Sequence, residues 1–295
     1  MKKVKFTGLL FSLTALLLAS CSNDDEETQS TATNSTLSLN VEGLEDLGTD
    51  FRYEGWLIVE GAPISTGTFS VDENGVLSQS QFEINAEQLN AAVSFVLSIE
   101  PVPDPSPDPA DTKIFVGDFE GKTAELNTGT VASSFNTVSG KFIIATPTGT
   151  GAEEEANSGI WFLDPSSGNP EAGLVLPELA AGWKYEGWVV IDGIPVTTGT
   201  FTSVSLADES DFFSGENPGP PFPGEDFLKN APEGLVFPTD LRGKTAVVSI
   251  EPFPDNSPSP FTLKPLASLI ADDASGVQEI ANNVAGSFPV GSVTR

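Results

Sequence analysis

The sequence contains no histidine, and its 295 residues include a single cysteine. Histidine is the commonest general base and zinc ligand, so Ser-His and Cys-His nucleophilic sites and the usual zinc sites are excluded. With one cysteine the chain forms no internal disulfide, and packing must hold the fold. Only 13 residues are basic against 42 acidic, a net charge of −29. A polyanion would be repelled, so no nucleic-acid partner is expected.

Long helical periodicity is also scarce. Short apolar runs are separated by 28 glycines and 23 prolines, which is typical of strands joined by turns. This pattern predicts an all-β protein with two tandem immunoglobulin-like β-sandwich domains and few short helical turns. One helical turn is expected at residues 86–92, because Asn85 followed by Gln88 resembles a capping box.

The chain writes one hairpin motif twice. Tyr53-Glu-Gly-Trp-Leu-Ile-Val-Glu-Gly-Ala-Pro-Ile-Ser-Thr-Gly-Thr-Phe69 returns as Tyr185-Glu-Gly-Trp-Val-Val-Ile-Asp-Gly-Ile-Pro-Val-Thr-Thr-Gly-Thr-Phe201. Branched apolar residues on both sides of an acid-Gly turn predict a β-hairpin.

The hairpin turn also predicts a register. A loop at Gly61-Ala62, or a wider loop at residues 60–63, would place Trp56 opposite Gly67. By the same count Trp188 would lie opposite Gly199. A glycine across from a large ring leaves room for the ring over the backbone, so both tryptophans are expected in the core. The alternative is a ligand-stacking platform.

A second motif follows each hairpin. Phe95-Val-Leu-Ser-Ile-Glu-Pro-Val-Pro-Asp104 corresponds to Ala246-Val-Val-Ser-Ile-Glu-Pro-Phe-Pro-Asp255. The apolar part predicts a strand buried on both faces. The proline after the glutamate ends strand pairing because it lacks an N–H, so an exposed, stiff loop is expected next.

The first residues have the pattern of a bacterial export signal. Lysines precede an apolar run, and Leu18-Ala-Ser-Cys21 resembles the lipobox of bacterial lipoproteins. The resemblance implies a signal peptide at residues 1–20 and a lipid on Cys21, which would hold the protein on a membrane. Residues 21–36 are too polar to fold alone and are predicted to be a disordered tether. Their acidic cluster resembles an outer-membrane export signal, with exposure at the cell surface left open.

The repeats also divide the chain. A first β-sandwich domain is expected at residues 37–137 and a second, larger one at residues 138–295. The second domain carries an insertion at residues 208–237 that is rich in Pro, Gly, Phe and acidic residues.

Both halves resemble one known family. The pattern Tyr-x-x-Trp-Val-Val-x-x-Gly-x-Pro-Val-Thr-Thr-Gly-Thr-Phe, followed by Val-Ser-Ile-Glu-Pro and a Pro-rich loop, is similar to the extracytoplasmic C-terminal domain of anti-sigma-K factors. The likeness covers residues 40–109 and 174–260. It implies a sensor-like β domain outside the cytoplasm. The family's transmembrane helix and cytoplasmic sigma-binding segment have no counterpart in this pattern, so no direct sigma-factor binding is expected.

The repeated aromatic and acidic residues are the candidate binding surface. They are Trp56, Trp188, Glu54, Glu186, Glu100 and Glu251. Two carboxylates across a cleft would suit glycoside hydrolysis, so a carboxylate-dependent enzyme acting on cell-surface polysaccharide is the alternative function. A pair of strand-end acids that bind neighbouring donors explains the duplication more simply.

No cofactor is predicted, and calcium alone stays open. Hard oxygen ligands gather at Asp104, Asp108 and Asp111, although their spacing does not match an EF-hand loop. The sequence as a whole predicts a non-catalytic, lipid-anchored envelope protein. Its ligand or partner would be an envelope protein or a polysaccharide.

Overall fold

The computed structural model describes residues 33–255 and 257–295 of the chain. The predicted signal peptide, Cys21 and residues 21–32 of the predicted tether lie outside this part. Residues 34–36 of that tether belong instead to the first strand, where Asn34 pairs with Asn85 and Thr36 with Glu83. Among the described residues no helix is long and apolar enough to cross a membrane.

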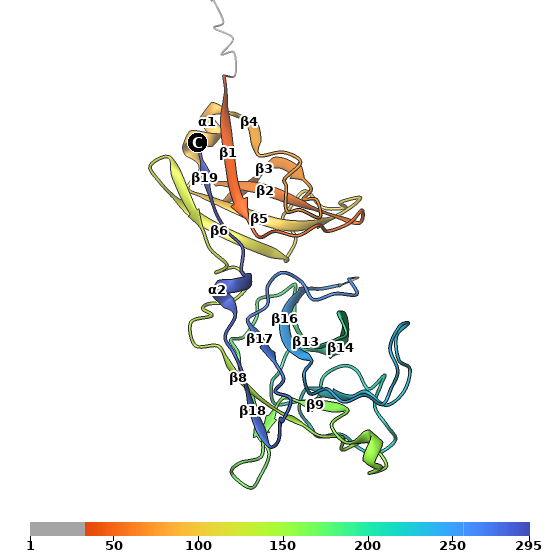
Figure 1. Ribbon diagram of the computed structural model, residues 1–295. Coiled ribbons are helices and arrows are strands. Elements are labelled where there is room, and N and C mark those ends of the chain that lie inside the picture. Colours follow the sequence, from red (N-terminus) through yellow and green to blue (C-terminus); the bar gives the residue numbers. More distant parts are fainter. Residues whose placement is uncertain (1–32, 256) are drawn as a thin grey trace, which may run out of the picture. The chain divides into compact units, whose positions relative to one another are not determined.

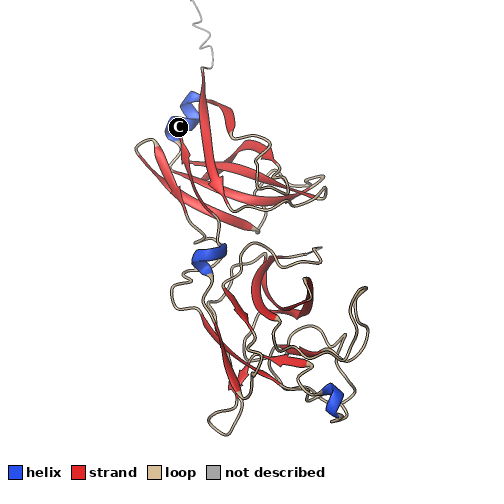
Figure 2. Cartoon of the chain, viewed as in Figure 1, coloured by secondary structure: helices blue, strands red, loops and turns tan. Residues whose placement is uncertain are grey.

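The all-β prediction is confirmed, and the helices within the described residues are two short α-helices and one 3₁₀ turn (Figure 2). The first half builds the following elements: β1 (Asn34–Glu42), β2 (Phe51–Val59), β3 (Ala62–Phe69), β4 (Gln81–Asn85), α1 (Ala86–Ala91), β5 (Ser94–Pro101), β6 (Lys113–Glu120) and β7 (Thr123–Leu126). Asn85 caps α1 as predicted, since its Oδ1 accepts from the backbone N–H groups of Glu87 and Gln88.

The second half builds the following elements, several of which are strands of only two to four residues. They are β8 (Ser139–Ile144), η1 (Glu153–Glu155), β9 (Gly159–Trp161), β10 (Leu163–Asp164), β11 (Glu171–Ala172), β12 (Leu174–Val175), β13 (Trp183–Ile191), β14 (Ile194–Phe201), β15 (Gly224–Asp226), β16 (Thr245–Pro252), β17 (Leu266–Leu269), β18 (Val277–Ile280), α2 (Val284–Ser287) and β19 (Val290–Thr294). The strands β14, β13, β16 and β17 form one sheet in that order. A second sheet runs β12, β8, β9 and β15, with β18 on β8, and β10 pairs with β11.

The last strand, β19, belongs to the sheet of the first half, although the sequence predicts a domain boundary at residue 137. In the eight-stranded sheet of the first half the order is β3-β2-β5-β6-β7-β19-β1-β4, so β19 lies between β7 and β1 (Figure 1). Val293 pairs with Leu39 on one side and Ala124 on the other, and it is fully buried. The end of the chain thus completes the sheet that its beginning starts, which no local pattern near residue 290 indicates.

The predicted hairpin register is wrong for two reasons. The turn lies one residue earlier than the predicted two-residue loop, and the hairpin contains a β-bulge. The turn is Glu60-Gly61, with φ values of 52° and 82°, so Val59 pairs directly with Ala62. Two consecutive residues with positive φ are the mark of a type I′ turn, whose twist matches the twist of the two flanking strands. A β-bulge after Gly55 then places Gly55 opposite Gly67, while Trp56 pairs with Ser65.

The second hairpin repeats both features. Its turn is Asp192-Gly193, and its bulge places Gly187 opposite Gly199 and Trp188 opposite Thr197. The glycines therefore face each other rather than the tryptophans. A Cβ at Gly187 would overlap Thr198 Oγ1 and lie 2.8 Å from the ring of Phe162, so these positions keep glycine for space.

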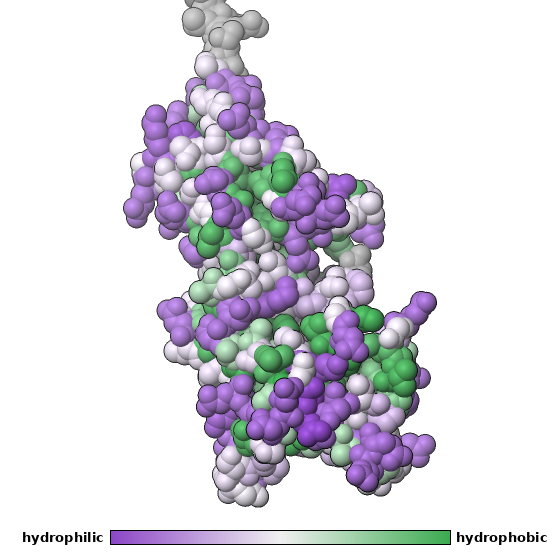
Figure 3. Space-filling model, in the orientation of Figure 1, coloured by the Kyte–Doolittle hydropathy of each residue, from purple (hydrophilic) through white to green (hydrophobic). Residues whose placement is uncertain are grey.

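The predicted insertion folds as part of the second half. It supplies β15 and a buried cluster of aromatic rings in which Phe213 contacts Phe227 and Phe237 at centroid distances of 5.7 and 5.6 Å. Such ring pairs bury large apolar areas, which stabilises a segment with little regular structure. The visible face is mostly hydrophilic with separate apolar patches (Figure 3), as the acidic composition leads one to expect.

Candidate functional site

The first repeat contains a chain of hydrogen bonds that runs from the sheet into the following loop. Trp56 Nε1 donates to Ser98 Oγ over 2.8 Å, and Ser98 Oγ donates to the carboxylate of Glu100. The same Glu100 oxygen accepts the backbone N–H of Ala110 at 2.8 Å. Because Trp56, Ser98 and Glu100 are at most 2% exposed, each needs such a partner.

The second repeat builds the same chain from its own residues. Trp188 Nε1 donates to Ser249 Oγ over 2.8 Å, and Ser249 Oγ donates to Glu251. Glu251 then accepts the backbone N–H of Phe261 at 3.0 Å. The two glutamates thus close loops of equal length, at residues 101–110 and 252–261, by holding the far end of each loop against the strand that begins it.

A second pair of repeated acids lies beside this chain. Glu54 accepts a hydrogen bond from Ser65 Oγ, and Glu186 accepts one from Thr197 Oγ1. Both acids are under 9% exposed. The donors stand directly across the hairpin bulge, so the bulge determines which side chain reaches the acid.

Burial is the main cause of the raised pKa values of these acids. It raises the pKa of Glu251 to about 8 and that of Glu186 to about 7, and it also raises the pKa of Glu100. Hydrogen bonds from serine or threonine lower each pKa but offset burial only in part. Glu251 is therefore mostly neutral at pH 7.

The six residues of the candidate binding surface are consequently interior residues. Trp56 and Trp188 are each 2% exposed, which confirms the core interpretation of the tryptophans and leaves no stacking platform. The structure corrects the idea of a surface made by these residues. Sequence spacing does not show the hairpin bulge or the loop that folds back over each glutamate.

The weak calcium candidates do not converge. Asp104 Oδ1 accepts the backbone N–H of Ser106 at 2.8 Å, Asp108 is exposed, and Asp111 lies at a different place beside a cavity. In residues 33–255 and 257–295 no group of three or more acidic, histidine or cysteine residues is placed to hold a metal ion.

The insertion brings together acids that sequence reasoning missed. Asp226 and Glu225 on β15 are fully buried. Asp226 accepts hydrogen bonds from Trp161 Nε1 at 2.8 Å and from Thr148 Oγ1 at 2.6 Å. Burial raises the pKa of Glu225 to about 7 and raises that of Asp226 as well. These contacts attach the insertion to β9, so the acids serve packing of the insertion.

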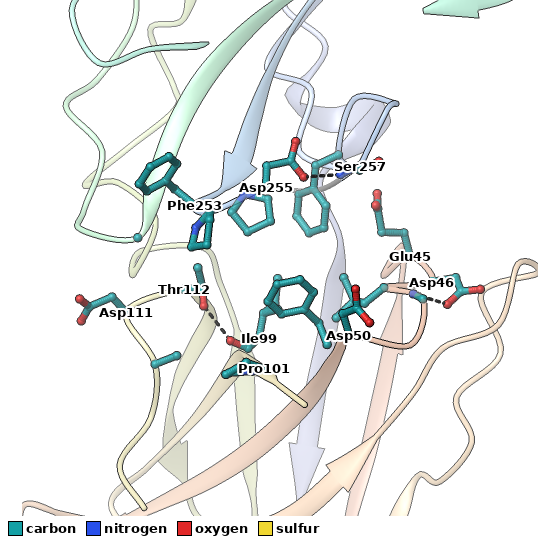
Figure 4. A pocket seen from close by; sticks show the side chains of 18 of the residues that line it. Glu45, Asp46, Asp50, Ile99, Pro101, Asp111, Thr112, Phe253, Asp255 and Ser257 are labelled. Atoms are coloured by element: carbon teal, nitrogen blue, oxygen red, sulfur yellow. Dashed lines mark hydrogen bonds between the residues drawn. The ribbon is translucent and has the colours of Figure 1, made fainter. Parts of the chain in front are cut away.

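A cavity of about 880 Å³ lies where both Pro-rich loops begin or end (Figure 4). We call it the acidic cavity. Its carboxylates are Glu45, Asp46, Asp50, Asp111 and Asp255. No lysine or arginine occurs among the described residues that line it. In Figure 4 Asp111 is at one end, and Glu45, Asp46 and Asp50 are at the other.

Aromatic rings and prolines form the apolar part of the acidic cavity. They include Phe51, Pro101, Phe253, Pro254 and Phe261. The loops are the same segments whose ends Glu100 and Glu251 hold, since Ala110 and Phe261 both line the cavity. The buried glutamate of each repeat therefore holds in place a loop that forms part of the cavity wall.

Sequence reasoning anticipated the Pro-rich loops but missed the cavity. Residues 45–51, which lead from β1 into the first residue of β2, supply much of its lining and belong to no repeated motif. A clue was present in Glu45-Asp46 followed by Gly48 and Asp50, an acidic turn beside the aromatic Phe51.

The chain matches no protein-family model, no curated protein and no solved structure. What the site does must therefore be argued from its own chemistry.

Proposed function

We propose that this protein is a non-catalytic, lipid-anchored envelope protein that binds a ligand or partner at the acidic cavity. The cavity itself carries the proposal. It has the volume of an ordinary small-molecule site, and its lining combines aromatic rings with several carboxylates. The lipid on Cys21 and an outer-membrane location complete the proposal on the sequence pattern alone.

The buried acids support a binding role over the alternative enzyme. A glycosidase needs two carboxyl groups that reach the sugar. Glu54, Glu100, Glu186 and Glu251 are all under 9% exposed and accept hydrogen bonds from neighbouring hydroxyl groups. A polysaccharide has no path to them. The likeness to anti-sigma-K factors fits a sensor-like binding module, and sigma-factor binding is not part of the proposal.

Filling the cavity tests the binding role. Thr49 is exposed and lines the cavity, so Thr49→Trp places a large ring in its opening. The control is Thr202→Trp, at an exposed threonine outside the cavity lining. Immobilised protein is incubated with envelope extract, and the bound material is quantified by mass spectrometry. We expect Thr49→Trp to lose a component that the parent and the control retain, at an unchanged melting temperature. Identical profiles for all three proteins would overturn the proposal.

A further inference from the structure

The acidic cavity has a chemical preference that its lining reveals. Five carboxylates and no described lysine or arginine line it, while its walls are aromatic. We propose that its ligand is a small organic cation, an ammonium group joined to an aromatic or aliphatic body. This inference rests on the proposed binding function and names the ligand class for the same cavity.

The cavity offers carboxylates for the ammonium group of such a ligand and aromatic rings for its apolar body. Glu45, Asp46 and Asp50 lie at one end in Figure 4. Phe51 and Phe261 are among the aromatic residues that line the same cavity. A cation gains Coulomb energy from the carboxylates, and its apolar body leaves water against the rings. An anion would face the five carboxylates of the lining, and a neutral ligand would gain from the rings alone.

Glu45 is a carboxylate of the cavity lining whose charged form a bound cation would stabilise. Burial raises its pKa to about 7, and the nearby Lys264 offsets this only in part. The four ion pairs found among the described residues do not include Glu45. A bound ammonium group would supply the positive charge that this half-buried carboxylate has only at a distance.

The aromatic wall already receives one cation within the structure. Lys184 Nζ lies 4.0 Å from the centroid of the Phe253 ring, a cation–π distance. Phe253 lines the cavity and is 51% exposed.

Three matched probes test the ligand class. Phenethylammonium, 2-phenylethanol and 3-phenylpropanoate have one ring and carry a positive, a zero and a negative charge. Binding to the full chain in detergent micelles is measured by isothermal titration calorimetry at pH 8. We expect the cation to bind about tenfold more tightly than the alcohol, with no binding of the anion, and the preference to shrink in high salt.

Variants locate the binding. Glu45→Gln and Asp46→Asn should each weaken phenethylammonium binding severalfold while leaving the alcohol unchanged, and Asp46→Asn keeps an oxygen for the backbone N–H of Gly48. Asp118→Asn, an exposed acid outside the lining, should have no effect. Equal binding of the alcohol, or of the cation to Thr49→Trp, would overturn the cation proposal. If the envelope component still depends on an open cavity, the proposed function survives that failure.

Discussion

At the residue scale, the hydroxyl group of Ser249 is the link that the repeated motif needs. It accepts from Trp188 and donates to Glu251, and all three side chains are buried. Replacing it by alanine leaves an indole N–H and a carboxyl group without that partner, so Ser249→Ala should lower the free energy of unfolding by about 1–3 kcal/mol. Urea denaturation followed by tryptophan fluorescence measures this.

Two other serine substitutions serve as controls for Ser249→Ala, one at the equivalent serine of the first repeat and one at an exposed serine. Ser98→Ala in the first repeat should cost a similar amount, because Ser98 makes the same two bonds. Ser205→Ala, at an exposed serine, should change stability by under about 0.5 kcal/mol. If Ser249→Ala is as mild as Ser205→Ala, the hydrogen-bond chain does not hold the loop.

The raised pKa of Glu251 predicts how stability depends on pH. The folded protein keeps the proton up to a pKa of about 8, whereas the unfolded chain releases it near 4.5. The folded state therefore binds more protons between these values, and its stability falls as pH rises from about 5 to 8.5. Glu186, with a pKa of about 7, adds to the same slope.

Substitution of the acid tests this assignment. Glu251→Gln keeps a neutral group of the same shape, so its melting temperature should fall less steeply than that of the parent across this pH range. Glu87→Gln, at an exposed acid on α1, should keep the parental slope. Parallel curves for the parent and Glu251→Gln would contradict the buried, protonated glutamate.

At the element scale, the hairpin bulge gives two neighbouring threonines opposite roles. Thr197 Oγ1 donates to the buried Glu186 and accepts the backbone N–H of Gly199 at 2.8 Å. Thr198 is fully buried, yet its Oγ1 has no hydrogen-bond partner. Replacing threonine by the similarly shaped valine should therefore cost about 1–3 kcal/mol at Thr197 and close to zero at Thr198.

Chemical denaturation of the two threonine variants compares them directly. The order of their stabilities is the result that matters, because both changes add the same methyl group and remove the same hydroxyl group. A larger loss for Thr198→Val than for Thr197→Val would mean that the bulge has been assigned to the wrong residue.

At the scale of the whole molecule, the strand β19 ties the end of the chain to its beginning. Val293 is fully buried between β1 and β7, whereas Val290 on the same strand is 62% exposed. Val293→Asp would bury an unpaired carboxylate and should destabilise the protein by several kcal/mol. Val290→Asp should be nearly neutral. Thermal melts of the two variants measure the difference, and equal melts would place β19 outside the core.

The anchoring of the whole protein depends on Cys21, which lies outside the described residues. Cys21→Ser should leave the protein without lipid and move it from the membrane fraction to the soluble fraction, because the lipid on Cys21 is the anchor that the sequence pattern predicts. Fractionation after a high-salt wash measures this, with Ser22→Ala as the control. Sedimentation of Cys21→Ser with membranes would reject the lipoprotein prediction.

The sequence by itself determined the features that depend on near neighbours. Alternating apolar residues and turn residues predicted the all-β class, and Asn85 predicted the start of α1. Two copies of one motif predicted two equivalent hairpins with buried tryptophans. These features follow from side-chain periodicity and turn chemistry, which act over a few residues.

Only the tertiary structure decided features that join distant residues. The bulge beside Gly55 changed the hairpin register, and it depends on the space between Gly55, Thr66 and the ring of Phe95. The partners of β19 lie 165 to 256 residues earlier in the chain, from Gly291 with Leu126 to Thr294 with Ser38. The acidic cavity likewise gathers residues from 45 to 261. Burial of apolar surface stabilises whichever distant segments pack closely in the folded chain. The spacing of residues in the sequence does not show which segments these are.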